Sequence, residues 1–247
     1  VLFALTLILV GACHKGAPPS QEPSKSPVTA TPSEETTETS TDDAVVKSDE
    51  ATAMHQRFLA VNAIRDAVIS GDLPAAKGRA DKLAKDENLG SVLADWGQFT
   101  KNLQKEVEAT AAATDLRTAA VHTAAAADAC GQCHKSLGIA TLEEKTEPRP
   151  ADDGSVGGIM RQHHWATSRM WDGLVAPSMA SWETGAKALV DISRNAQLQP
   201  KVKSDKELAS LLGEVEKRAT EASQAVTGPE RTHALGQLLA TCSGCHQ

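Results

Sequence analysis

Two copies of the pattern Cys-x-x-Cys-His are the residues in this sequence best suited to chemistry. The first copy consists of Cys130, Cys133 and His134, and the second of Cys242, Cys245 and His246. Two cysteines three positions apart on a helical turn can form thioethers with the two vinyl groups of one haem. The adjacent histidine then lies beneath the iron as its proximal ligand. The sequence therefore predicts two covalently bound haems c, with His134 and His246 as proximal iron ligands.

Two other kinds of site use the same residue types. A structural disulfide or a thioredoxin-like site also uses Cys-x-x-Cys, but a thioredoxin-like site needs a βαβ context that this helical sequence lacks. A zinc site needs four converging ligands, whereas each cysteine pair lies in its own half of the chain. The sequence therefore favours haem attachment over both.

Helices are predicted to position both motifs. Alanine, leucine, lysine and glutamate dominate the chain, tyrosine is absent and there are 3 phenylalanines, a composition that favours helices over strands. With so few aromatic side chains, a large apolar cofactor would form a substantial part of any interior. The predicted fold class is all-α: two tandem four-helix bundles at residues 51–138 and 157–247, each ending in a C-terminal haem-attachment helix.

Capping and breaker residues divide each bundle into helices. In the first bundle we predict helices over residues 51–70, from the capped start at 72–74, from the break at 88–91 to about 113, and over 114–134. In the second we predict helices over residues 158–176, onward to 194, from a capping box at 204–207, and from the break at 228–230 to the last residues, with a loop around Pro200. Met54 and Asp66 match Met160 and Asp172 at a constant offset of 106, so the bundles are predicted repeats.

The first 50 residues are predicted to be a targeting segment and a tether. Residues 1–13 resemble a bacterial lipoprotein signal peptide, because an apolar run too short to span a bilayer is followed by Gly11-Ala12-Cys13. This lipobox predicts lipidation of Cys13; the alternative is a plain signal peptide with an incidental cysteine. Residues 14–50, rich in Pro, Ser, Thr and Glu, are predicted to be a disordered linker, and 139–156 a second linker. The predicted location is the periplasmic side of a bacterial membrane, held by a lipid anchor.

The net charge of −7 lies mainly in the linkers. Residues 19–50 carry −6 and residues 139–156 carry −3, while the predicted bundles are close to neutral. No basic stripe is present that could neutralise nucleic-acid phosphates, so the sequence does not support nucleic-acid binding.

Each predicted bundle resembles the cytochrome c-prime family and its low-spin relatives, over residues 51–138 and 157–247. The resemblance implies a four-helix bundle with the haem motif near the end of the last helix, and a first helix that crosses the other face of the haem. In low-spin members that helix supplies a methionine as sixth iron ligand. In high-spin members it supplies an apolar residue and leaves the iron open.

The resemblance makes Met54 and Met160 candidate sixth ligands, because they occupy equivalent positions on the two first helices. Met54 also belongs to an apolar stripe with Phe58, Val61 and Val68, and a methionine on such a stripe is more often a core residue. Both interpretations of Met54 stay open.

The second bundle offers two more candidate ligands, His163 and His164, in place of Arg57 and Phe58. His164 lies one helical turn beyond Met160 and shares its face. Bis-histidine ligation would lower the potential of the second haem relative to a Met/His first haem. Other aromatic and histidine side chains are predicted to pack in the core (Trp165, Trp171, Trp182) or to lie at the surface or near a propionate (His122, His233).

The leading functional hypothesis is a di-haem electron-transfer protein with redox proteins as partners. The sequence shows no constellation of nucleophile, base and orienting group, so no enzyme and no small-molecule substrate are predicted. The alternative is a gas-binding or gas-sensing protein with at least one five-coordinate iron, for which Phe58 would suit the first site. A di-haem peroxidase is the weaker third class, because no separate catalytic or calcium-binding loop region is present.

Overall fold

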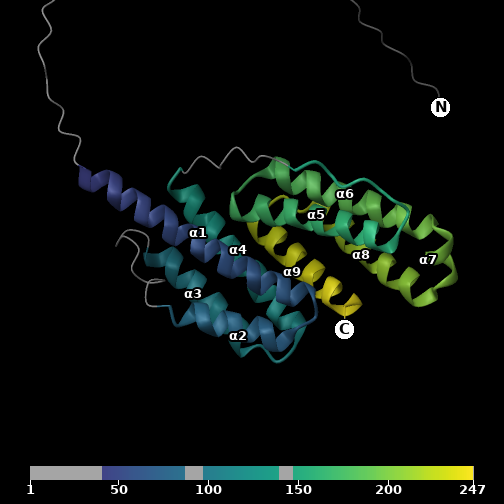
Figure 1. The fold of residues 1–247 in the computed structure, drawn as a ribbon, viewed down its shortest axis with the longest axis horizontal. Coiled ribbons are helices and arrows are strands. Elements are labelled where there is room, and N and C mark those ends of the chain that lie inside the picture. The colour runs from purple at the N-terminus through teal and green to yellow at the C-terminus, as the bar shows by residue number, and fades with distance from the viewer. Residues whose placement is uncertain (1–40, 87–96, 139–146, 247) are drawn as a thin grey trace, which may run out of the picture. The chain divides into compact units, whose positions relative to one another are not determined.

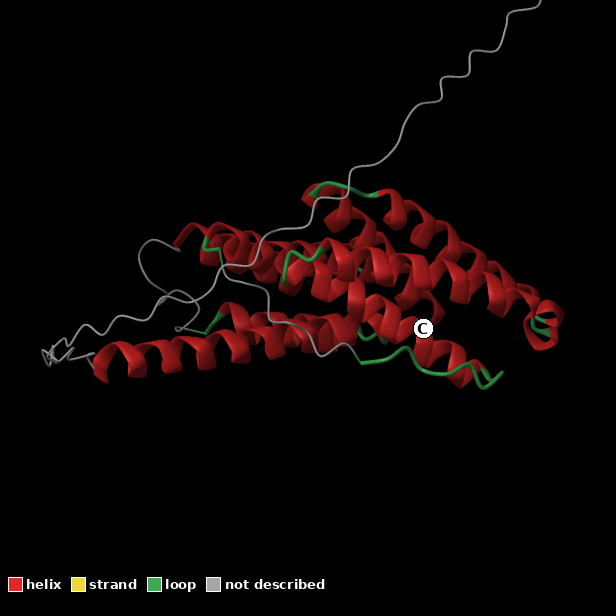
Figure 2. Ribbon diagram, turned by 90° about the horizontal axis from the view of Figure 1, so that it is seen from above, coloured by secondary structure: helices red, strands yellow, loops and turns green. Residues whose placement is uncertain are grey.

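Helices form all the regular secondary structure that the computed structural model describes (Figures 1 and 2). The structure describes residues 41–86, 97–138 and 147–246. No strand occurs in these ranges, which confirms the all-α class. No helix among them is both long and apolar enough to span a membrane. The predicted lipobox with Cys13, most of the predicted linker 14–50, the predicted break at 88–91 and residues 139–146 of the second linker lie outside the described residues.

The helices follow the predicted order, with differences at the start of α1 and at α7. They are α1 (Thr41–Ile69), α2 (Leu73–Ala84), α3 (Gly97–Ala112), α4 (Leu116–Ser136), α5 (Val156–Val175), α6 (Met179–Leu198), α7 (Pro200–Ser204), α8 (Lys206–Gln224) and α9 (Gly228–Cys245). Helix α1 begins at Thr41, ten residues before the predicted start at Ala51. The short helix α7 replaces the predicted loop at Pro200, whose fixed φ suits a first helical turn.

Side-chain caps define most of the helix starts. The Asp72 carboxylate accepts a hydrogen bond from the Ala75 amide at 2.9 Å, as the sequence predicted. Thr227 and Glu230 form a capping box at the start of α9. At α8 the cap is Asp205 rather than Ser204, because the Asp205 carboxylate accepts from the Leu208 amide at 3.0 Å. Such caps typically contribute about 1 kcal/mol each.

The motif-bearing helices α4 and α9 pack against each other at the centre of the helical unit. Along the chain, α1 packs on α2, α2 on α3 and α3 on α4; likewise α5 packs on α6, α6 on α8 and α8 on α9. Close approach of α4 and α9 is possible because Gly236 has no side chain: a Cβ there would lie 3.1 Å from the Val121 Cα. One continuous core of mostly alanine, leucine and valine side chains connects the helices.

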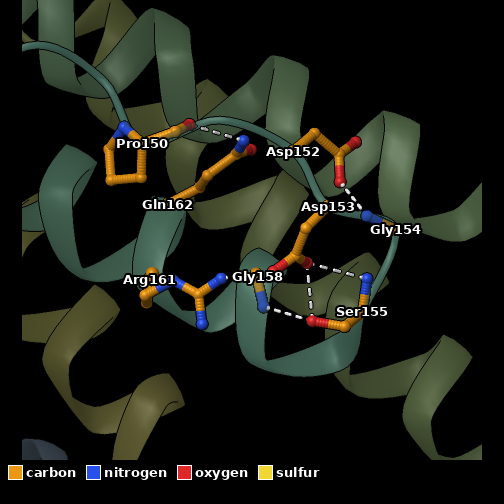
Figure 3. Close-up of polar contacts among 8 residues, drawn as sticks. All are labelled: Pro150, Asp152, Asp153, Gly154, Ser155, Gly158, Arg161 and Gln162. Carbon is orange, nitrogen blue, oxygen red and sulfur yellow. Dashed lines mark hydrogen bonds and ion pairs between the residues drawn. The ribbon is translucent and has the colours of Figure 1, made fainter.

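A polar cluster fixes the start of α5, the helix that carries three candidate iron ligands (Figure 3). The Asp153 carboxylate accepts hydrogen bonds from the Ser155 hydroxyl at 2.6 Å and the Ser155 amide at 3.0 Å, and it pairs with Arg161 one turn into the helix. The Ser155 hydroxyl in turn caps the helix by accepting from the Gly158 amide at 2.9 Å. These bonds lower the pKa of Asp153 to about 2.

This cluster predicts a pH-dependent contribution to stability. A carboxyl group whose pKa is lower in the folded chain stabilises it above the unfolded pKa, and the contribution is lost as pH falls through the folded pKa. We therefore expect Asp153→Asn to destabilise the protein at neutral pH, with the difference from wild type shrinking between pH 4 and pH 2. Urea unfolding over that range measures it, and a difference that stays constant down to pH 2 would contradict the expectation.

Candidate haem-attachment sites

The first motif occupies the last two turns of α4. Cys133 is buried, and Cys130 and His134 are half-buried. The helix continues through all three residues, which places the two thiols one turn apart with the imidazole directly after them. This is the local geometry that two thioethers and a proximal ligand require.

The His134 imidazole is held by one hydrogen bond. Its Nδ1 lies 2.9 Å from the Val175 carbonyl oxygen at the end of α5. A carbonyl oxygen only accepts, so Nδ1 carries the proton and Nε2 keeps a free lone pair. Metal-ligating histidines are commonly held in this way, with the second ring nitrogen donating to a carbonyl or carboxylate. The residues of the first motif therefore fit a haem.

The backbone of α5 lies directly against this motif. Gly131, the residue after the first cysteine, is buried, and a Cβ atom there would overlap the Leu174 carbonyl oxygen and lie 3.3 Å from its carbon. Glycine thus permits the approach that brings the next carbonyl, Val175, to His134. No sequence pattern indicated that a residue of the second predicted bundle would lie at the first motif.

The thiols of both motifs are unsuited to disulfide-exchange chemistry. Burial, together with the neighbouring thiols Cys133 and Cys245, raises the pKa of Cys130 and of Cys242 to about 12. Reactive thiols instead have lowered pKa values, typically at helix N-termini, whereas both motifs lie at helix C-termini, where the helix dipole disfavours a thiolate. In the part of the chain that the structure describes, no three His, Cys, Asp or Glu side chains converge to form a zinc site.

The second motif occupies the end of α9 and is more exposed than the first. Cys242 is half-buried, whereas Cys245 and His246 are exposed. Ser243, the residue equivalent to Gly131, is buried and bonds the Ala240 carbonyl at 2.8 Å. The two motifs thus share their helical position but differ in their surroundings.

Helices α4 and α9 are antiparallel, so the motifs lie towards opposite ends of the pair (Figure 1). The position of Gly228, at the start of α9, lies beside Asp128 near the end of α4. In the opposite direction, Arg117 at the start of α4 bonds Gln237 towards the end of α9 at 3.2 Å. Each motif lies about ten residues from the midpoint of the α4–α9 contact, and the two lie in opposite directions from it. At a rise of about 1.5 Å per residue, the two motifs are therefore about 30 Å apart along the helix pair.

Two α1 side chains lie in the neighbourhood of the first motif. Arg57 is only 7% exposed, and its guanidinium is close enough to Cys130 for the two groups to interact electrostatically. Burial lowers the pKa of Arg57, while Asp86 and Cys130 oppose that shift. The Arg57 guanidinium also donates to the Met54 sulfur at 3.7 Å. Met54 therefore lies near the first motif, and Arg57 is a further site residue that the sequence did not single out.

The candidate ligands on α5 differ in exposure. Met160 is half-buried, His164 is exposed, and His163 is half-buried beside the Ser193 hydroxyl, at 3.4 Å from its Nε2. Burial lowers the pKa of His163 to about 4, so this imidazole is neutral at physiological pH. Within the described residues, no hydrogen bond or ion pair joins any of these side chains to the second motif.

The remaining residues singled out in the sequence divide between core and surface. Trp171 and Trp182 are buried, whereas Trp165 is half-buried and bonds the Glu147 carbonyl at 2.8 Å. His122 bonds Glu106 at 2.8 Å, and His233 is exposed.

Comparison with known proteins adds no independent assignment. No protein-family model, curated protein or solved structure matched this chain. The functional argument therefore rests on the motifs and on the geometry around them.

Proposed function

We propose that this chain is a di-haem c-type cytochrome that transfers electrons outside the cytoplasm. The observation that carries the proposal is the His134 imidazole, placed one position after a cysteine pair and held by Val175 with Nε2 free. A second Cys-x-x-Cys-His motif ends α9. When bound, haem supplies one-electron chemistry between ferric and ferrous iron.

The helix contacts support two tandem four-helix bundles. Helices α1 to α4 pack in chain order, and α5, α6, α8 and α9 do the same, with the short α7 between α6 and α8. Each set ends in a helix that carries one motif. In the proposed assignment α1 and α5 are the equivalent first helices, and α4 and α9 are the equivalent haem-attachment helices.

The protein's own residues would perform three tasks at the first site. Cys130 and Cys133 would hold the haem covalently, and His134 would ligate the iron. Arg57 would place a buried positive charge near the haem, which favours the reduced state, since local charge and burial tune haem potentials. The sixth ligand remains the proposal made from the sequence, with Met54 for this site and Met160, His163 or His164 for the second.

The separation of the motifs favours two independent redox centres. Because the motifs lie about 30 Å apart along α4 and α9, and electron tunnelling falls exponentially with distance, direct exchange between the haems would be slow. Each centre would then exchange electrons with a redox protein at its own end of the helix pair. Attachment to a bacterial membrane through Cys13, on the periplasmic side, completes the proposal.

A gas-binding protein is the second candidate, and one contact favours it. The Met54 sulfur accepts a hydrogen bond from Arg57, so one of its two lone pairs is engaged by a group other than iron. An iron without methionine would be five-coordinate and open to a small molecule.

Absorption spectra of the oxidised and reduced protein, before and after addition of carbon monoxide, distinguish the two functions. For an electron carrier we expect sharp low-spin bands that carbon monoxide does not shift, because both sixth positions are filled. Methionine ligation adds a weak band at the far red edge of the visible spectrum. Complete absence of this band would exclude both Met54 and Met160 as iron ligands. A high-spin signal that carbon monoxide shifts would instead support gas binding.

A further inference from the structure

We infer that the proximal ligand of the first haem is positioned by the second bundle, through the Val175 carbonyl at the C-terminal end of α5. The inference rests on the proposed function, since it concerns how His134 would hold iron. It assigns Val175 a positioning role, and it makes the properties of the first haem depend on residues that come after its own motif in the chain.

The Val175 carbonyl is available because α5 ends there. The last carbonyls of a helix have no partner within the helix. The Ala176 amide bonds to Asp172 at 2.8 Å and closes the last turn. The Val175 oxygen is thereby presented beyond the helix end, where the His134 Nδ1–H donates to it at 2.9 Å. The bond joins residues 41 positions apart.

The end of α5 is fixed by contacts on several sides. Leu174 and Val175 are buried, and Arg231 of α9 donates to the Gly173 carbonyl at 3.4 Å. One turn earlier, Trp171 is fully buried, with the Arg65 guanidinium 5.0 Å from its ring centroid. Helix α1 of the first bundle therefore also holds α5. The carbonyl is a rigid acceptor rather than part of a free loop end.

Donation from Nδ1 to a carbonyl increases the basicity of the ligating nitrogen. A more basic ligand stabilises ferric iron relative to ferrous iron, so this bond would lower the potential of the first haem. Ile69 ends α1 at the position equivalent to Val175, and α1 packs on α9. The same arrangement is therefore open to His246, although His246 is exposed in this structure.

Gly131→Ala in the full-length holoprotein tests the inference. Its Cβ would overlap the Leu174 carbonyl, so the end of α5 must move away from α4 while the cysteines and His134 stay in place. We expect both haems to remain attached and one of the two potentials to rise. Loss of such a hydrogen-bond partner typically lowers metal affinity about ten-fold. When the loss falls on the ferric state, the ratio of ferric to ferrous affinity changes by the same factor, which corresponds to a rise in potential of about 59 mV for one electron. The matched control is Gly213→Ala on α8, where a Cβ meets no atom within 4 Å.

A potentiometric titration monitored by absorption gives the result. One wave shifted upward in Gly131→Ala, with neither wave shifted in Gly213→Ala, supports the role of Val175. Two unchanged waves in Gly131→Ala would overturn it. A wild-type protein that carries no haem would instead refute the proposed function, and intact mass establishes this before the titration.

Hydrogen exchange in the wild-type protein keeps the inference testable if Gly131→Ala fails to fold. The reduced protein under carbon monoxide is diamagnetic whether or not its irons are open, so imidazole protons can be followed by NMR. We expect the His134 Nδ1 proton to exchange slowly, because it is bonded and half-buried, and the exposed His246 to exchange quickly. Equally fast exchange at both histidines would overturn the inference.

Discussion

Replacing Cys130 and Cys133 together by serine is expected to remove one covalent haem and leave the other in place. Serine forms no thioether, and His134 alone would leave any haem at that site dissociable. The two motifs lie far apart on α4 and α9, and changes at distant sites usually act independently. Intact mass after denaturation should therefore show the chain with one haem instead of two, and the covalent haem content measured by absorption should fall by half.

The reciprocal variant, Cys242→Ser with Cys245→Ser, is the matched control. It should also retain one haem, and its remaining spectrum should be the complement of the first variant's. The variant with all four serines should retain none. Two haems in either double variant would show that haem is attached elsewhere, and loss of both haems in either one would show that the motifs are not independent.

Trp182→Ala is expected to have the largest effect on folding stability. The Trp182 side chain is 1% exposed, and its indole N–H donates to the Ala222 carbonyl at 3.0 Å, which ties α6 to α8. The Arg231 guanidinium lies 5.8 Å from the ring centroid. Truncating a buried tryptophan to alanine typically costs about 3–5 kcal/mol, because transfer free energy is lost and a cavity is left behind. Urea unfolding followed by circular dichroism measures this cost.

Two other variants locate the origin of the effect. Trp182→Phe keeps most of the apolar volume but loses the donor, so its cost should be clearly smaller than that of alanine. Trp165→Ala truncates a half-buried ring and should also cost less. An equal loss of stability for Trp165→Ala and Trp182→Ala would mean that burial at Trp182 is not the cause.

The sequence predicted those parts of the fold that local chemistry determines. The Asp72 cap is set by residues within one turn, and α2 begins where that capped start was predicted. The capping box of Thr227 and Glu230 was missed, because Gly228-Pro229-Glu230 was interpreted as the break before the last helix. The early start of α1 was missed because residues 41–50 lack an apolar period. A helical segment without such a period depends on the packing of the helix that it extends, and here α1 continues into the buried face around Val61 and Ile64.

The candidate site divides in the same way. The motif residues could be proposed from the sequence because their spacing along one helix suits the chemistry of haem attachment. The proposed role of Val175 could not be predicted, because it depends on where the end of α5 meets α4. It also belongs to a backbone carbonyl, which the identity of the residue does not reveal. Arg57 was seen only as the residue that His163 replaces. Its burial near Cys130 depends on the packing of α1, which periodicity alone does not give. The sixth ligands stay predictions.

The contact between Arg65 and Trp171 has a consequence for the symmetry of the molecule. In the proposed repeats the two residues are equivalent at the offset of 106, yet they touch each other. Equivalent residues of two copies meet where a two-fold axis relates the copies, and the antiparallel pairing of α4 with α9 is compatible with such an axis. The proposed repeats are thus arranged as a homodimer would be, with its subunits joined in one chain. In a homodimer of one such repeat this position would set arginine against arginine. In a single chain the two positions can differ, and here they form a cation–π pair.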